Sequence, residues 1–99
     1  MKIEGNVAVI TGAASGIGHA VASELIQQGI KHLALVDFAD AVTEVADRIN
    51  EAGNGTTAAA HVGDATDAGF RETVFQQTRL EHGLIRLCVP AAGITRDSL

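Results

Sequence analysis

The sequence predicts an α/β fold in which a parallel sheet carries helices on both of its faces. Short apolar runs alternate along the chain with segments of helical periodicity, and this alternation is typical of βαβ units. The first apolar run, residues 7–10, leads into a glycine-rich turn and then into a helical pattern. Because crossovers between parallel strands are right-handed, we expect the strand order 3-2-1-4, the first half of a doubly wound fold.

Each element has its own signal. The first strand is an uninterrupted apolar run, as in strands covered on both faces. Gly29 stands where the first helix needs a C-terminal cap, and the second helix has an apolar stripe opposite a charged face. The third strand is a weaker prediction, because its three consecutive alanines are poor strand formers. The predicted strands are residues 7–10, 31–37, 57–62 and 84–89; the predicted helices begin at residue 15 or 16, at about residue 40 and after a cap at Thr66 or Asp67, and end at about residues 28, 52 and 81.

Composition limits the classes of protein to consider. Ninety-nine residues make one small domain, expected to cover residues 1–99. The net charge of −5 argues against nucleic acid and anionic membranes as partners, and no apolar stretch approaches the ~20 residues of a membrane span.

The single cysteine, Cys88, excludes an internal disulfide and fits a reducing cytoplasm. Since Cys88 lies in an apolar strand, we expect it to be a small core residue. The four histidines are scattered without a metal-ligand spacing, so we expect solvated or strand-end histidines and no metal site.

The glycine-rich turn has the composition of an anion-binding loop. Gly12, Gly16 and Gly18 fall where the chain must leave a strand and enter a helix whose free N–H groups attract a phosphate. The spacing is neither G-x-G-x-x-G nor that of a P-loop. Ser15 is expected to cap the helix, to donate to a phosphate oxygen, or to do both. Ile17 is expected to be a core residue and a wall of the pyrophosphate site.

Asp37 follows Gly18 by 19 residues, at the end of the second predicted strand. A dinucleotide-binding fold places at that position the carboxylate that binds both ribose hydroxyls of adenosine. A carboxylate there repels the 2′-phosphate of NADP, so the sequence favours NAD. The alternative is an acid that only ends a strand.

The stretch from Thr11 to Gly18 resembles the short-chain dehydrogenase/reductase family, because it fills every position of the family pattern T-G-x-x-x-G-[IL]-G. The resemblance implies a Rossmann-like fold. It also implies that Asp64 meets the adenine amino group with Ala65 as its backbone companion, although Asp64 also fits a simple turn at a strand end. Residues 90–93 are similar to the family's N-N-A-G stretch: Ala92 and Gly93 match, whereas Pro90 and Ala91 replace the two asparagines. The end of the chain looks most like the 3-oxoacyl-carrier-protein reductase branch.

The family's catalytic pair, Tyr-x-x-x-Lys, is not in these 99 residues, which contain no tyrosine and only the lysines Lys2 and Lys31. We therefore assign no catalytic residue. The resemblance implies the NAD-binding portion of an enzyme that transfers hydride between a nicotinamide and an alcohol or ketone, in a family that is commonly oligomeric. The alternatives are a dinucleotide-binding module without turnover and a fragment that serves only in assembly through an exposed fourth-strand edge.

Overall fold

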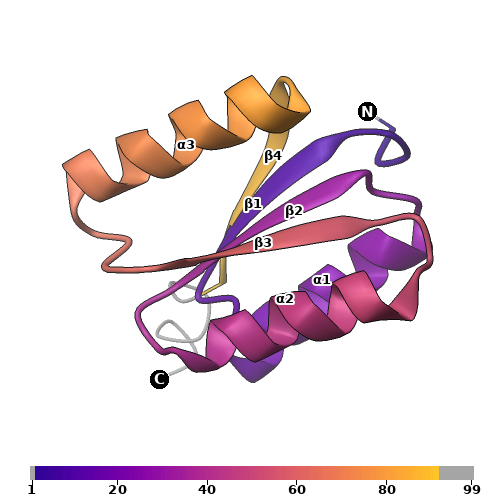
Figure 1. The fold of residues 1–99 in the computed structure, drawn as a ribbon, viewed down its shortest axis with the longest axis horizontal. Coiled ribbons are helices and arrows are strands. Elements are labelled where there is room, and N and C mark those ends of the chain that lie inside the picture. The colour runs from indigo at the N-terminus through magenta and orange to yellow at the C-terminus, as the bar shows by residue number, and fades with distance from the viewer. Residues whose placement is uncertain (1, 92–99) are drawn as a thin grey trace.

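The computed structural model describes residues 2–91, which form one four-stranded parallel sheet with helices on both faces (Figure 1). The strand order β3-β2-β1-β4 is the predicted one. All neighbouring strands run parallel, so their carboxyl ends meet at one edge of the sheet. The elements in chain order are β1 (Val7–Thr11), α1 (Gly16–Gln27), β2 (His32–Asp37), α2 (Ala41–Ala52), β3 (Thr57–Val62), α3 (Ala68–His82) and β4 (Ile85–Pro90).

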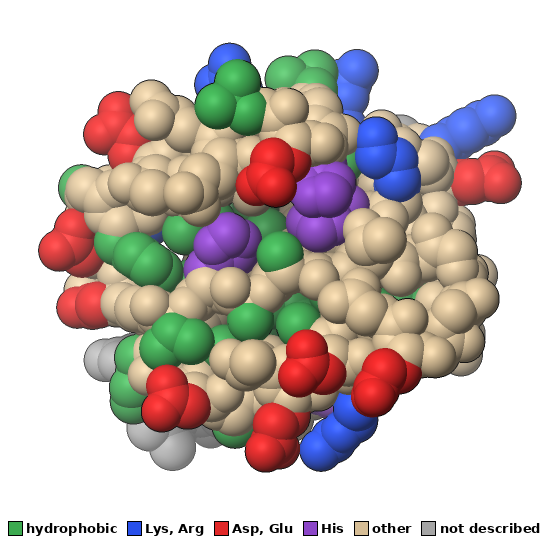
Figure 2. All heavy atoms as spheres, in the orientation of Figure 1, with side chains coloured by type: hydrophobic (Ala, Val, Ile, Leu, Met, Phe, Trp, Pro, Cys, Tyr) green, Lys and Arg blue, Asp and Glu red, His purple; other side chains and the backbone are tan. Residues whose placement is uncertain are grey.

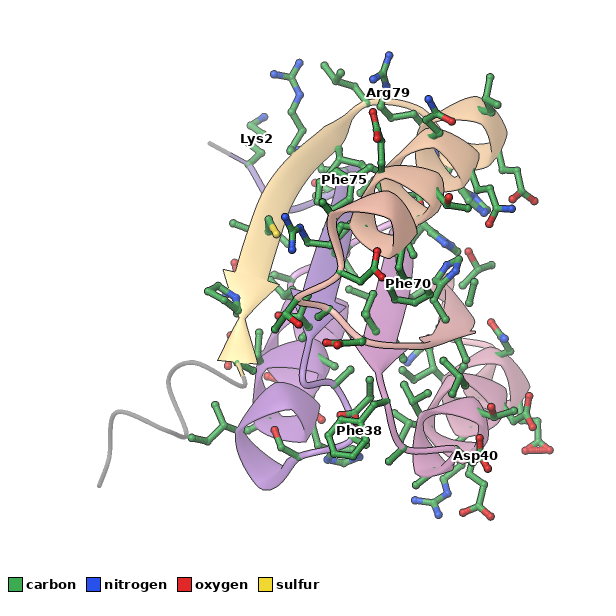
Figure 3. All side chains as sticks on the ribbon, turned by 90° about the vertical axis from the view of Figure 1, so that its left-hand side faces the viewer. Lys2, Phe38, Asp40, Phe70, Phe75 and Arg79 are labelled. Atoms are coloured by element: carbon green, nitrogen blue, oxygen red, sulfur yellow. The ribbon has the colours of Figure 1, made fainter. Side chains whose placement is uncertain are left out.

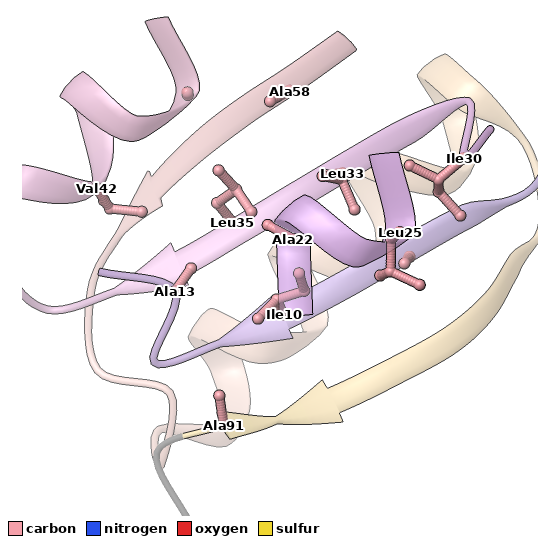
Figure 4. Close-up of a cluster of buried hydrophobic side chains, with 12 residues drawn as sticks. Ile10, Ala13, Ala22, Leu25, Ile30, Leu33, Leu35, Val42, Ala58 and Ala91 are labelled. Atoms are coloured by element: carbon pink, nitrogen blue, oxygen red, sulfur yellow. The ribbon is translucent and has the colours of Figure 1, made fainter. Parts of the chain in front are cut away.

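The helices α1 and α2 cover one face of the sheet and bury most of the core. Strand residues of one parity point to this face, because side chains alternate along a strand. Ile10, Leu33 and Leu35 contribute the central side chains and are fully buried. Figure 4 shows them between the strands and the helical residues Ala22, Leu25 and Val42. This side of the molecule is a closed two-layer core.

Among the helices of residues 2–91, only α3 covers the opposite face (Figure 1). The buried cluster there is small: Val9, Ala34 and Val36 from the strands meet Val74 of α3. Phe70 and Phe75 of α3 pack against this cluster while remaining partly exposed. Figure 3 shows both rings between α3 and the sheet. Because one helix spans too little of a four-stranded sheet, this face is only partly covered.

The prediction that Cys88 is a core residue is wrong. Cys88 pairs in register with Val9 and therefore points to the α3 face, where its side chain is exposed. It lies in a groove of about 570 Å³ whose walls include Thr11, Arg71 and Phe75. Its strand, β4, is an edge strand, and an apolar strand sequence does not reveal whether a neighbouring element covers it.

Histidines lie along the seam between α3 and the sheet, as Figure 2 shows. His32 is the first residue of β2, as expected for a strand-end histidine, yet its side chain is only 2% exposed. Its ring stacks on that of His82 with centroids 3.4 Å apart, and its Nδ1 lies 2.7 Å from Thr57 Oγ1. Burial, with the nearby positive charges of His82, His61 and Lys31, lowers the pKa of His32 to about 4. This histidine therefore acts as a neutral packing residue.

Among the helices of residues 2–91, none has the length and hydropathy that crossing a membrane requires. Within the same residues, histidine, cysteine and acidic side chains nowhere gather in a group of three that could hold a metal ion.

Candidate functional site

The predicted site residues lie at the edge where the carboxyl ends of the strands meet. There β1 leads into the glycine loop, residues 12–15, and β2 ends at Asp37. A backbone hydrogen bond joins these two strand ends, since Ala13 N–H donates to Val36 O (3.1 Å). Another joins the end of β2 to the residue after β3, since Gly63 N–H donates to Asp37 O (3.0 Å). The strand ends are thus fixed relative to one another before any ligand binds.

The glycine loop is closed on itself around Ser15. Gly12 turns the chain with φ of 70°, a conformation that favours glycine. The Ser15 hydroxyl donates to Gly12 O (2.7 Å) and accepts from Gly18 N–H (3.0 Å), and the Ser15 N–H also donates to Gly12 O (3.1 Å). The predicted capping role of Ser15 is confirmed. Its contact with a phosphate stays a prediction.

The two glycines in the first turn of α1, directly after the loop, serve different purposes. A Cβ on Gly18 would lie 2.4 Å from Gly12 O and 2.8 Å from Ala13 Cα, so only glycine lets α1 approach the loop this closely. A Cβ on Gly16 would meet nothing within 4 Å. Gly18 is therefore needed for packing, whereas a side chain on Gly16 would enter open space.

The start of α1 also carries unpaired hydrogen-bond donors. The structure gives the N–H groups of Gly16 and Ile17, at the start of α1, no hydrogen-bond partner within residues 2–91. Free N–H groups at a helix N-terminus, together with the positive end of the helix dipole, favour a bound anion. Ile17 also packs against the core, as predicted.

The carboxylate of Asp37 lies against the loop. Its Oδ2 accepts from Ala14 N–H and its Oδ1 accepts from Ala39 N–H, both at 2.9 Å. The side chain is half-buried and held in one orientation. Ala14 and Ala39 could not be predicted as partners of Asp37 from the sequence, because they donate through the backbone and their side chains carry no signal.

Phe38, next to Asp37, is also a new candidate. Its ring is 83% exposed, which is unusual for so large an apolar side chain. Figure 3 shows it near α1 and α2, away from Phe70 and Phe75. An aromatic residue directly after the strand-ending acid was the available signal in the sequence.

Asp64 and Ala65 follow β3 at the same edge of the sheet. Asp64 is exposed, and its Oδ1 accepts from Thr66 Oγ1 (2.7 Å) and Thr66 N–H (2.9 Å). These two hydrogen bonds lower the pKa of the Asp64 carboxyl. Such a turn fits the alternative reading of Asp64, so contact with adenine stays a prediction. Ala92 and Gly93 lie outside the described residues.

The arrangement can bind an anion and ribose hydroxyls at adjacent points. Donors at the start of α1 suit a pyrophosphate, and the oriented carboxylate of Asp37 suits a pair of hydroxyls. A further anionic group beside Asp37 finds no positively charged side chain in residues 12–18 or 37–40, which contain no lysine or arginine.

Comparison with known proteins extends this reading. The family model described as short chain dehydrogenase matches residues 6–99. A 3-oxoacyl-(acyl-carrier-protein) reductase FabG from Salmonella typhimurium is 33% identical over 99 residues, which are all of this chain and 38% of that protein. A 2,3-dihydro-2,3-dihydroxybenzoate dehydrogenase from Bacillus subtilis is 37% identical over 98 residues, 98% of this chain and 36% of that protein. The chain thus spans less than two fifths of the length of these curated relatives.

Solved structures share the fold. A short chain dehydrogenase/reductase from Burkholderia phymatum, in complex with NAD, superposes with a TM-score of 0.77 at 28% identity, covering 89% of this chain and 31% of that one. A short-chain dehydrogenase structure from Novosphingobium aromaticivorans superposes with a TM-score of 0.78 at 20% identity, covering 88% of this chain and 31% of that one.

Proposed function

This chain belongs to the short-chain dehydrogenase family, and on that premise we propose that it forms the NAD-binding portion of an enzyme that transfers hydride between a nicotinamide and an alcohol or ketone. The two curated relatives named above act, by their names, on different substrates. The proposal therefore extends to the alcohol and ketone class and to no single compound.

One observation carries the proposal: the Asp37 carboxylate lies beside a glycine loop that leads to two free N–H groups. In the bound state, Gly16 and Ile17 donate to the pyrophosphate, and Asp37 accepts from the adenosine ribose. The open space at Gly16, which a Cβ would enter without meeting protein, gives the pyrophosphate its room. Bound NAD supplies the nicotinamide carbon that accepts or gives the hydride.

The remaining site residues are proposed to contact the adenine and the nicotinamide ribose of the cofactor. Asp64 and Ala65 are proposed to bind adenine, and the exposed Phe38 offers it an apolar surface. Ala92 and Gly93 are proposed to reach the nicotinamide ribose through backbone and methyl groups, because Pro90 and Ala91 replace the family's asparagines.

The choice of NAD over NADP follows from charge. The 2′-phosphate of NADP would lie beside the Asp37 carboxylate, with no lysine or arginine in residues 12–18 or 37–40 to offset the repulsion. In NAD the same carboxylate instead accepts hydrogen bonds from the free hydroxyls.

Titration of the protein with NADH and with NADPH, followed by calorimetry, tests the proposal. We expect NADH to bind at least about tenfold more tightly than NADPH, since one unfavourable charge pair at a partly solvated site costs more than 1.4 kcal/mol. Absence of NADH binding by the protein would overturn the cofactor assignment. A preference for NADPH would overturn the role given to Asp37.

The proposed setting is a homo-oligomer in the cytoplasm, based on the family resemblance and on the single cysteine. The catalytic tyrosine and lysine must come from sequence outside these 99 residues, since none of the 99 is a tyrosine. NADH binding without turnover, in a protein whose intact mass shows no further chain, would instead indicate a dinucleotide-binding module. A stable oligomer that does not bind NADH would indicate a role in assembly alone.

A further inference from the structure

The hydrogen bonds of the glycine loop reveal how it is held. Two consecutive backbone amides of the loop are hydrogen-bonded to the end of β2: Ala13 N–H donates to the backbone oxygen of Val36, and Ala14 N–H donates to the side chain of Asp37. The first hydrogen bond involves backbone atoms only. The second depends on one carboxylate, 23 residues further along the chain.

The residues beyond Ala14 transmit this restraint to the anion site. Ser15 follows directly, and its N–H and hydroxyl are bonded to Gly12 O. The free N–H groups of Gly16 and Ile17 come next. A change in the position of Ala14 therefore changes the direction of these two donors.

We infer that Asp37 is a positioning residue for the phosphate-binding loop, in addition to the ribose acceptor of the proposed function. The inference about the ligand-free loop stands on the hydrogen bonds alone. Its effect on phosphate affinity rests on the proposed function.

Removal of the Asp37 carboxylate should change pyrophosphate affinity in opposite directions through its charge and through its hydrogen bond to the loop. Asp37→Ala removes a negative charge from beside an anion site, so electrostatics alone predicts tighter binding of inorganic pyrophosphate. It also leaves Ala14 N–H without its acceptor and loosens the loop at Ala14, which weakens binding because the donors that follow must be ordered again when the anion binds. If Asp37 positions the loop, the pyrophosphate affinity lost with the hydrogen bond exceeds the affinity gained by removing the negative charge.

Asparagine gives an intermediate case. The carboxylate accepts from two backbone donors, Ala14 N–H and Ala39 N–H, through separate oxygens. An amide has one oxygen, so in Asp37→Asn the amino group must face one of these donors. This variant is close to the natural side chain in shape and serves where Asp37→Ala does not fold.

Hydrogen exchange of the ligand-free protein, measured by NMR, tests the positioning role directly. We expect the Ala14 amide to exchange about tenfold faster in Asp37→Ala, and by a smaller factor in Asp37→Asn, because its charge-assisted hydrogen bond is lost. The amide of Val9 in the central strand reports the global stability and corrects for any general loosening. Unchanged exchange of Ala14 relative to Val9 in both variants would overturn the inference.

Asp40→Ala is the matched control. Asp40 is an exposed acid in the same segment, and its side chain makes no cap hydrogen bond to α2. We expect this control to leave Ala14 exchange unchanged and pyrophosphate affinity equal or higher, whereas Asp37→Ala lowers that affinity severalfold. Tighter pyrophosphate binding by Asp37→Ala, as by the control, would contradict positioning. Failure of the unmodified protein to bind NADH would count against the proposed function only, because Ala14 exchange is read without ligand.

Discussion

The two faces of the sheet differ in how completely they are covered. Under α1 and α2, a cluster of twelve buried residues closes one face (Figure 4). Under α3, the opposite face has a buried cluster of four residues, and Cys88 on the edge strand β4 is exposed there. Leu84, in the turn between α3 and β4, is 61% exposed. One helix cannot cover what two helices cover on the other side.

This difference shows which part of the fold the proposed cofactor site depends on. The glycine loop enters α1, and α1 packs on the closed face. The donors at Gly16 and Ile17 are thus anchored by a complete core. Within residues 2–91, the loop's hydrogen bonds go to its own residues, to the start of α1 and to the end of β2, and none goes to α3.

The largest expected effect contrasts the same truncation in the closed core and in the turn that follows α3. Leu35→Ala removes a fully buried side chain from the closed core, and we expect it to lower the free energy of unfolding by about 3 to 4 kcal/mol through lost transfer energy and a cavity. Leu84→Ala, the matched change in the turn between α3 and β4, should cost less than about 1 kcal/mol because its side chain already contacts water. Urea denaturation of both variants measures the contrast. Equal losses would mean that the Leu84 side chain is covered in solution.

A second prediction contrasts two glycines at the site. Gly18→Ala forces a methyl group against Gly12 O and Ala13 Cα, and we expect it to cost about 3 kcal/mol of stability. Gly16→Ala places its methyl in open space and should leave stability within about 0.5 kcal/mol, while it lowers NADH affinity by filling the pyrophosphate's room. Thermal unfolding and NADH titration separate the two effects. A stable Gly18→Ala protein with unchanged affinity would show that the close approach at Gly18 is unimportant.

A third prediction concerns pH and the open face. Because the pKa of His32 falls from 6.5 to about 4 on folding, the unfolded chain binds the proton more readily. Stability contributed by neutral His32 is therefore present above pH 6.5 and is lost as pH falls from 6.5 toward 4. At pH 5 the loss should reach about 2 kcal/mol. Urea denaturation at pH 7.5 and pH 5 measures it.

Nearby groups affect this pH dependence and define its control. His82, His61 and Lys31 add positive charge around His32, and Glu81 opposes the same trend at His61. Burial also lowers the pKa of His61, so His61 adds to the loss of stability as the pH falls. His32→Asn keeps a polar group near Thr57 and should flatten the pH dependence, whereas His19→Asn, at an exposed position on α1, should not. An unchanged slope in His32→Asn would rule out His32 as its source.

The fold could be predicted from the sequence pattern. Apolar runs and glycines mark the strands and helix ends, and these local signals predicted every element to within a few residues. The strand order followed from the alternation of strands and helices with right-handed crossovers. The capping of α1 by Ser15 was predictable for the same reason, since a cap depends on residues within one helical turn.

Features that depend on distant segments were not predictable. Cys88 is exposed because nothing beyond α3 covers β4 in the described residues, and an apolar strand does not reveal this. The burial of His32 depends on His82, and the orientation of Asp37 depends on Ala14, which lies 23 residues earlier. The identity of Asp37 was read from spacing, whereas its backbone partners required the fold.

The smallest expected effect is a gain in stability under α3. Thr78 is 2% exposed, and its hydroxyl has no hydrogen-bond partner in the part of the chain that the structure describes. Thr78→Val replaces this hydroxyl with a methyl group of similar size, and we expect the free energy of unfolding to rise by about 1 kcal/mol because an unsatisfied polar group leaves the interior. Thr73→Val on the same helix is the control, since its exposed hydroxyl donates to Gly69 O (3.0 Å) and gains nothing from removal. Destabilisation by Thr78→Val would show that the hydroxyl has a partner in solution and that the α3 face is better satisfied than its sparse core implies.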